Sequence, residues 1–204
     1  MHSERNMMNY DIDLSCTWYA LYTKHQHEKM VARVLTIKGF ETLLPLYQSA
    51  RRWKDRTKLL SLPLFPCYVF LKGGLDRRLD VMTTPGIYAL VSNAGRPAAI
   101  PHTEIEAIRL AVESGARVEP HPFLKCGEWM RVKSGPLAGV QGILVRKKNL
   151  CRLVLSVEML GKSAAVEVDA SLVERLNGKP PVAISYAVAS THAGPRSDGF
   201  ANQN

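Results

Sequence analysis

The side chains of residues 51–58 have the clearest chemical character in this chain. The segment reads Arg-Arg-Trp-Lys-Asp-Arg-Thr-Lys, with five basic residues, one acidic residue and one indole. Guanidinium groups make bidentate hydrogen bonds to phosphates, and an indole stacks on an unpaired base. Because the segment lies between two strand-like runs, we expect an exposed hairpin tip that binds nucleic acid. The alternative is a solvated loop with Trp53 folded back.

A second run, Leu-Phe-Pro-Cys-Tyr-Val-Phe-Leu at residues 64–71, is apolar and rich in aromatic residues. Alternation along a strand places Tyr68 and Phe70 on the face opposite Cys67 and Val69. An uncovered aromatic face of this kind usually marks a binding interface, and Tyr22 is expected to join it from a neighbouring strand. The alternative interpretation is ordinary core.

The remaining reactive side chains indicate neither catalysis nor a metal site. His25 and His27 stand two residues apart with no third ligand evident, so a role at the start of a helix is favoured. The four cysteines are scattered without CxxC spacing, which argues against a zinc site and a disulfide framework. We find no nucleophile–base pair and no phosphate-binding glycine pattern. The sequence predicts a binding protein with no catalytic residues, no metal and no cofactor.

Composition and charge agree with a nucleic-acid-binding protein. The 204 residues carry 27 Lys plus Arg against 18 Asp plus Glu, a net charge of +9. A basic surface attracts polyanions, nucleic acid above all, although solubility alone is an equally good explanation. No apolar stretch approaches the roughly 20 residues that span a bilayer, and residues 1–16 lack the apolar core of a signal peptide. We therefore predict a cytoplasmic protein with no membrane contact.

The elements that position these side chains follow from the hydrophobic pattern. Strands are predicted over 18–22, 40–46, 62–71, 87–92 and 98–100, and helices over 30–35 and 75–82. A capping box from Thr103 to Glu106 predicts a third helix over 104–114. Gly39 and Gly115 stand where glycine ends a helix. The fold class is α+β, with one antiparallel sheet covered by helices on one face.

The C-terminal part has a different pattern. Apolar residues alternate at Leu153, Leu155 and Val157, and again at Val166 and Val168. Such alternation between glycine-containing turns predicts a small all-β unit. The proline-containing segment 117–125 is the expected linker. We divide the chain into a flexible N-terminus (1–16), an N-terminal domain (17–116), the linker (117–125), a β-barrel (126–176) and a disordered tail (177–204).

The order of these segments resembles the NusG family of transcription factors. The stretches WYALYTK, LFPCYVFL and TTPGIYALV, with the basic hairpin between the first two, are similar to the family's N-terminal domain, called NGN. Residues 127–176 resemble its KOW domain, a small SH3-like barrel. The stretch from Pro45 to Phe70 is similar to the specialised paralogue RfaH, and residues 157–162 resemble the UpxY antiterminators. The resemblance implies an antitermination factor rather than an enzyme.

The resemblance also implies partners. The family's N-terminal domain binds the clamp helices of the largest RNA polymerase subunit and suppresses pausing. By position, the polymerase-binding residues are Tyr22, Phe65, Pro66, Tyr68 and Phe70. The residues that face non-template or upstream DNA are Lys24, His25, Arg51, Arg52, Trp53, Lys54, Arg56, Arg77 and Arg78. Residues Met159, Leu160, Gly161 and Lys162 would bind a further partner such as a small-subunit ribosomal protein. We expect a monomer.

Departures from the family pattern limit what carries over. Residues 77–80 read Arg-Arg-Leu-Asp instead of the His-Thr-Thr-Thr motif of RfaH, so its second polymerase contact and its DNA signal do not transfer. Leu160 replaces a phenylalanine through which NusG binds Rho, which argues against Rho binding. Valines at 140, 145, 154, 157, 166 and 168 favour strands, so we expect a stable barrel. Two alternatives remain: a housekeeping NusG that supports Rho, and a ribosomal or RNA-binding KOW protein.

Overall fold

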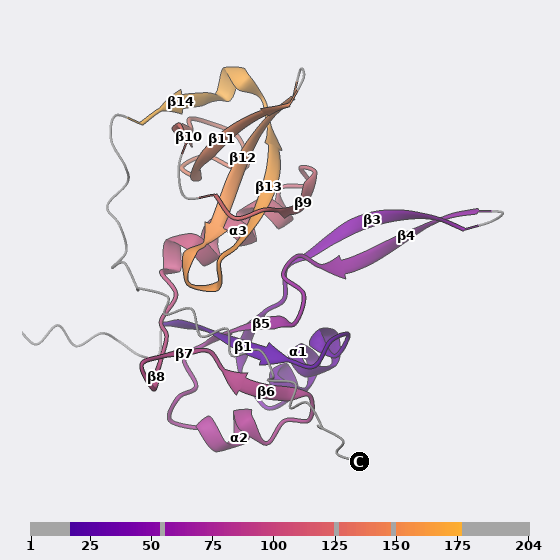
Figure 1. Ribbon diagram of the computed structural model, residues 1–204, viewed down its shortest axis with the longest axis vertical. Helices are drawn as coiled ribbons and strands as arrows, with labels where there is room; N and C mark the ends of the chain where they lie inside the picture. Colours follow the sequence, from indigo (N-terminus) through magenta and orange to yellow (C-terminus); the bar gives the residue numbers. More distant parts are fainter. Residues whose placement is uncertain (1–16, 54–55, 125–126, 148–149, 177–204) are drawn as a thin grey trace, which may run out of the picture.

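The N-terminal part is built on a four-stranded antiparallel sheet (Figure 1). The computed structural model describes residues 17–53, 56–124, 127–147 and 150–176. The sheet order is β2-β5-β1-β6. Its strands are β1 (Trp18–Thr23), β2 (Glu41–Leu43), β5 (Tyr68–Lys72) and β6 (Ile87–Leu90). The predictions for residues 1–16, Lys54 and residues 177–204 lie outside the described part of the chain.

Both faces of this sheet are covered, so the expectation of a single covered face is wrong. Strand alternation sends Tyr19 and Leu21 toward a cluster that includes Val31 and Leu35 of α1 (Glu28–Ile37) and Val81 of α2 (Arg78–Met82). Trp18, Ala20 and Phe70 belong to a second cluster, which includes Ile105 and Ile108 of α3 (His102–Glu113). Of the helices described, none is long and apolar enough to span a bilayer.

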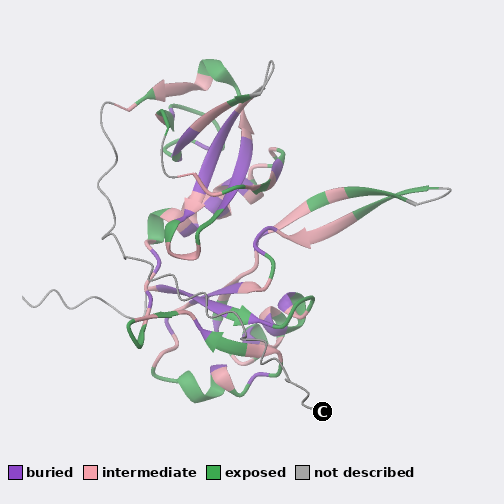
Figure 2. Cartoon of the chain, in the orientation of Figure 1, coloured by how far each residue is buried: buried purple, intermediate pink, exposed green. Residues whose placement is uncertain are grey.

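A long two-stranded hairpin leaves the sheet between β2 and β5. Strand β3 (Leu46–Trp53) pairs with β4 (Arg56–Pro63) from Leu46 opposite Pro63 to Trp53 opposite Arg56. Figure 1 shows the hairpin projecting away from the rest of the molecule, and Figure 2 shows that its outer half is exposed. The expected single strand over 62–71 is wrong, because β4 ends at Pro63 and a turn at Phe65–Tyr68 separates it from β5.

The C-terminal β unit, residues 118–176, is a six-stranded antiparallel sheet in the order β14-β10-β11-β12-β13-β9. Its strands are β10 (Trp129–Val132), β11 (Gln141–Lys147), β12 (Leu150–Val157), β13 (Lys162–Val168), β14 (Val173–Arg175) and β9 (Val118–His121). Two 3-10 turns, η1 (Glu158–Leu160) and η2 (Ala170–Leu172), flank β13. A Cβ on Gly142 would lie 2.8 Å from the carbonyl oxygen of Val154, so only glycine fits this close strand approach. The predicted α+β fold with an all-β C-terminal part is confirmed.

Two details near the junction differ from expectation. Helix α3 begins at His102, directly after Pro101, and no side chain caps it. Thr103 therefore lies inside the first turn, and Glu106 pairs with Arg109 instead of closing a capping box. The segment expected to be a linker contains β9, which pairs with β13 from Val118 opposite Val166 to His121 opposite Ser163. The short pair β7 (Ser92–Asn93) and β8 (Arg96–Pro97) precedes α3.

One hydrophobic cluster joins the N-terminal part to the C-terminal β unit. It contains Phe65 and Phe70 from the N-terminal part together with Leu153, Leu155 and other residues of the β unit. Helix α3 contributes Ile105 and Ile108 to the same cluster and contacts β12. Burying apolar area in one shared cluster holds the two parts together, because separating them would expose this surface to water.

Candidate polymerase- and nucleic-acid-binding surfaces

Three tyrosines form an aromatic group at one end of the N-terminal sheet. Tyr22 of β1 lies opposite Tyr68 of β5 in the strand pairing, and their ring centroids are 5.7 Å apart. The ring of Tyr88 in β6 lies 5.9 Å from Tyr22 on the other side. Tyr22 is 42% exposed and Tyr88 is 60% exposed. Burial raises the pKa of the half-buried Tyr68, and the neighbouring Tyr22 adds to this shift. This tyrosine group offers a ready aromatic contact surface.

Tyr88 was not among the predicted site residues. It lies in the run Ile-Tyr-Ala-Leu of β6, and Ala89 pairs with Tyr22. Period-two alternation would place Tyr88 on the face of the buried Leu90. The β1–β6 pairing shifts register between Tyr22 and Thr23, and the ring of Tyr88 lies beside Tyr22 instead. The hydrophobic pattern of the sequence does not indicate that β6 is a neighbour of β1 in the sheet. The proximity of Tyr88 and Tyr22 could therefore not be predicted.

The predicted polymerase-binding residues divide into an exposed and a buried group. Tyr22 and Pro66 are exposed and Tyr68 is half-buried, whereas Phe65 is 2% exposed and Phe70 is completely buried. The rings of Phe65 and Phe70 meet edge to face with centroids 5.7 Å apart. Both belong to the cluster that joins the two parts of the chain. Within this run the core interpretation holds for Phe65 and Phe70, and the interface interpretation stays a prediction for Pro66 and Tyr68.

The turn between β12 and β13 lies at this same place. Met159 and Leu160 pack against the cluster that contains Phe65 and Phe70. The positive charge of Lys162 acts on Cys67, beside Tyr68. Gly161 adopts a left-handed conformation with φ of 56°, which shapes the turn. Residues predicted to bind a further partner and residues predicted to bind the polymerase therefore share one hydrophobic cluster.

A carboxylate lies at the contact between α3 and this turn. Oε2 of Glu104 accepts a hydrogen bond of 3.2 Å from the backbone N–H of Glu158. Burial raises the pKa of Glu104 to about 7, the Glu158 N–H opposes this shift, and the charge of Glu158 adds to it. The protonation of Glu104 thus changes near neutral pH at a contact between the two parts.

The basic hairpin carries a row of exposed cations. Arg51, Arg52, Arg56 and Lys58 are exposed, and Arg51 pairs with Lys58 across the two strands. Among the described residues, no carboxylate lies within salt-bridge distance of these four cations. Trp53 ends β3 opposite Arg56. Like charges on one exposed ribbon favour a polyanionic ligand that neutralises them.

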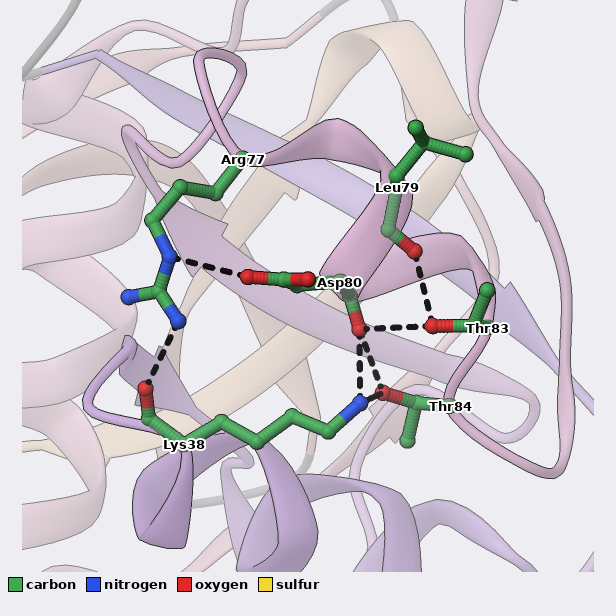
Figure 3. A network of polar contacts seen from close by, with 6 residues as sticks. All are labelled: Lys38, Arg77, Leu79, Asp80, Thr83 and Thr84. Atoms are coloured by element: carbon green, nitrogen blue, oxygen red, sulfur yellow. Dashed lines mark hydrogen bonds and ion pairs between the residues drawn. The ribbon is translucent and has the colours of Figure 1, made fainter.

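The other cations predicted to face DNA differ in their surroundings. Lys24 and Arg78 are exposed. Arg77 instead holds α2 against α1 (Figure 3). Its Nε donates to Oδ2 of Asp80 at 3.0 Å, and its Nη2 donates to the carbonyl oxygen of Lys38. Its guanidinium also lies 4.4 Å from the centre of the Phe40 ring. Arg77 is thus engaged within the fold.

Figure 3 shows how the same network continues from α1 to the end of α2. Nζ of Lys38 donates to the carbonyl of Asp80 at 2.7 Å and to Oγ1 of Thr84 at 2.8 Å. Oγ1 of Thr83 donates to the carbonyl of Leu79 at 2.8 Å. The network satisfies carbonyls at the end of a short helix, so its role is structural.

His25 lies in a cluster that the sequence did not indicate. Its Nδ1 is 3.7 Å from Sγ of Cys67, and Glu28 accepts a hydrogen bond of 2.8 Å from the backbone N–H of Cys67. The ligand atoms of His25, Glu28 and Cys67 all lie within 4.8 Å of one another. The sequence pairs His25 with His27, whereas the fold brings in Cys67 from 42 residues away. The sequence could not indicate this cluster, because Cys67 is far from His25 along the chain, and the expectation of no metal site stays a prediction.

Comparisons with known proteins find a matching family model and several similar proteins. Residues 16–109 match the family model described as "Transcription termination factor nusG". The chain is 28% identical over 174 residues to the transcription termination/antitermination protein NusG of Pseudomonas aeruginosa, which covers 78% of this chain and 98% of that protein. The NusG protein of Deinococcus radiodurans is 29% identical over 191 residues, covering 79% of this chain and all of that protein. The solved structure "Domain interaction in Thermotoga maritima NusG" is 20% identical, with a TM-score of 0.47, and covers 78% of this chain and 97% of that one.

Proposed function

The chain carries a NusG-family domain over residues 16–109, and from this premise we propose that it is a transcription elongation and antitermination factor without catalysis of its own. Its relatives over most of the chain are named transcription termination/antitermination proteins. The observation that carries the proposal is that this domain presents both the tyrosine group and a hairpin with exposed cations at Arg51, Arg52, Arg56 and Lys58. An aromatic anchor next to a cationic arm suits a protein that binds another protein and nucleic acid together.

We infer that the tyrosine group and Pro66 bind the clamp helices of RNA polymerase. Aromatic residues supply much of the energy of protein interfaces, because they bury large area at low entropic cost. Tyr22 and Pro66 are exposed without any rearrangement. Phe65 and Phe70 would extend the contact only where the C-terminal β unit moves away from them.

The hairpin is the proposed contact with upstream or non-template DNA. Arg51, Arg52 and Arg56 supply phosphate contacts, and Trp53 and Lys54 complete the predicted set. Lys24, His25 and Arg78 are the further candidates. Arg77 contributes mainly by holding α2 in place, since its guanidinium is already bonded to Asp80 and Lys38. Contacts of this type position a protein on nucleic acid without reading its sequence.

The turn Met159–Lys162 is the proposed site for a further partner such as a small-subunit ribosomal protein. Met159 and Leu160 are half-buried against the N-terminal part, so binding of this partner and binding of the polymerase through Phe65 both require the two parts to separate. Leu160, where NusG presents phenylalanine, favours a specialised antiterminator of the RfaH or UpxY type over a factor that supports Rho.

Single-round transcription with purified RNA polymerase tests the proposal. The template carries a pause site and a Rho-dependent terminator, and the protein is added or omitted. We expect shorter pauses and more readthrough with the protein. Increased termination with Rho would instead identify a housekeeping factor. No change on this template and on a template with the native leader, together with no polymerase binding, would overturn the proposal.

A further inference from the structure

Three side chains with metal-binding atoms meet beside the tyrosine group. His25 lies in the turn after β1, Glu28 is the first residue of α1, and Cys67 lies in the turn before β5. A backbone hydrogen bond joins the end of β1 to the turn before β5, because the Thr23 N–H donates to the Cys67 carbonyl at 2.9 Å. The imidazole, carboxylate and thiol are thus positioned by the fold and do not depend on a single flexible loop.

The spacing of the donor atoms fits a tetrahedral metal ion. With Zn–S near 2.3 Å and Zn–N near 2.0–2.1 Å, a sulfur and a nitrogen on one tetrahedral ion stand roughly 3.6 Å apart. Sγ of Cys67 and Nδ1 of His25 are 3.7 Å apart. The carboxylate of Glu28 lies within 4.8 Å of both. Only small side-chain adjustments would bring all three onto one ion.

The surroundings of Glu28 independently favour the binding of a cation. Glu28 is buried, with 2% of its surface exposed. It accepts the Cys67 N–H, and among the described residues no basic group lies within salt-bridge distance of it. Buried carboxylates are normally paired with a cation or bound to a metal, because an isolated buried charge is costly. The start of α1 offers partial compensation through its dipole, and a bound ion would supply the remainder.

We propose that His25, Glu28 and Cys67 form a binding site for a divalent cation of the zinc class. Thiolate, imidazole and carboxylate are the ligand types that zinc takes, whereas magnesium and calcium prefer oxygen alone. Three protein ligands leave a fourth position, and the exposure of His25 leaves that position accessible from solvent. Binding would join the turn after β1 to the turn that carries Pro66 and Cys67, next to Tyr68.

Cobalt titration of the full-length protein, freed of metal and of any affinity tag, tests the site. We expect one Co²⁺ per chain with a thiolate-to-cobalt charge-transfer band, and Zn²⁺ should displace it. His25→Ala and Cys67→Ser should each weaken binding by more than the roughly 10–100-fold typical of changes around metal ligands. His25 is the safer variant, because its exposed side chain leaves the fold least affected.

Matched controls separate this site from other thiols and histidines. His27→Ala changes the neighbouring histidine, and a Cys16→Ser, Cys126→Ser, Cys151→Ser variant keeps Cys67 as the only cysteine. Both should retain the band and the affinity. Absence of a thiolate band in the unaltered protein would overturn the proposal, as would undiminished binding by the His25→Ala and Cys67→Ser variants. Since the titration contains no polymerase or DNA, its result is independent of the proposed function.

Discussion

At the scale of single residues, a substitution of an aromatic side chain in the N-terminal part tests either the stability of the fold or the proposed polymerase contact, depending on whether that side chain is buried. Phe65 and Phe70 are buried in the shared cluster, so alanine there would cost about 3–5 kcal/mol of stability. Impaired binding in such a variant would not distinguish an interface from a core. Tyr22 is exposed and contacts Tyr68 and Tyr88 through its ring, which makes it the cleaner probe of the proposed polymerase contact.

Tyr22→Ala should weaken RNA polymerase binding with little effect on folding. An aromatic anchor in an interface contributes about 2 kcal/mol or more, which corresponds to a decrease in affinity of roughly thirtyfold. Binding of labelled protein to the polymerase measures the affinity, and thermal unfolding checks the fold. Leu79→Ala is the matched control, because Leu79 is an 80% exposed apolar residue on α2. Equal affinities of the Tyr22 and Leu79 variants would exclude the tyrosine group from the interface.

At the scale of elements, the β3–β4 hairpin carries its cations away from the body of the protein. Eight cross-strand pairs run from Leu46–Pro63 to Trp53–Arg56. The half near the sheet contains apolar residues, and the outer half contains Arg51 opposite Lys58. Like charges directly opposite one another destabilise a strand pair. Since no carboxylate of the described residues lies within salt-bridge distance of these cations, the hairpin is suited to a ligand that brings its own negative charge.

Arg51→Glu combined with Arg52→Glu should weaken nucleic-acid binding and flatten its salt dependence. Removing one phosphate-binding cation lowers the slope of log K against log salt by roughly 0.7 for a single strand, because one fewer counterion is released. Fluorescence anisotropy with single-stranded DNA at several salt concentrations measures this slope. Arg33→Glu on α1, an exposed cation outside the hairpin, is the control. If the hairpin variant and this control gave the same slope, the hairpin would not be the DNA contact.

At the scale of the whole molecule, residues of the two predicted partner sites share one hydrophobic cluster. Leu160 and Met159 pack against the cluster that buries Phe65, and Glu158 donates its N–H to Glu104 of α3. The contact is therefore both apolar and hydrogen-bonded. Phe65 is buried in the shared cluster whereas Tyr22 is exposed, so we expect the arrangement of the two parts to govern how much of the predicted polymerase-binding surface is accessible.

Leu160→Asp should raise the affinity for RNA polymerase. An unpaired carboxylate placed against an apolar cluster is unfavourable, so the two parts would separate more often and expose Phe65. Polymerase binding measures the outcome, with Lys133→Asp as a control at an exposed position of the same β unit. Unchanged or lower affinity in the Leu160 variant would show that masking of Phe65 does not limit binding.

Glu104 should make the stability of this arrangement depend on pH. Its pKa is raised from 4.5 to about 7 in the folded protein, so the folded state binds a proton more tightly than the unfolded state. Its contribution is fully present below about pH 4.5 and is lost as the pH rises through about 7. The Glu104→Gln variant lacks this contribution. The difference in melting temperature between wild type and variant should therefore change between these pH values, whereas a constant difference would contradict the assignment.

Several features were determined by the sequence alone, because they depend on local patterns. Alternating apolar residues predicted the strands of the C-terminal β unit, and the three- and four-residue spacing of Val31 and Leu35 predicted α1. The charge of the segment 51–58 predicted an exposed hairpin, and the structure has it. Gly39, with φ of 84°, ends α1 as expected. Each of these signals lies within a few residues of the element it describes.

Only the tertiary structure decided which side chains meet. His25 and Cys67 are 42 residues apart in sequence, and Glu104 and Glu158 are 54 apart, so no local pattern relates them. The same holds for Tyr22 and Tyr88, which depend on the strand order, and for Phe65, whose burial depends on the C-terminal β unit. The hydrophobic periodicity of a segment indicates which of its faces is apolar. What covers that face is set by the free energy of packing the whole chain.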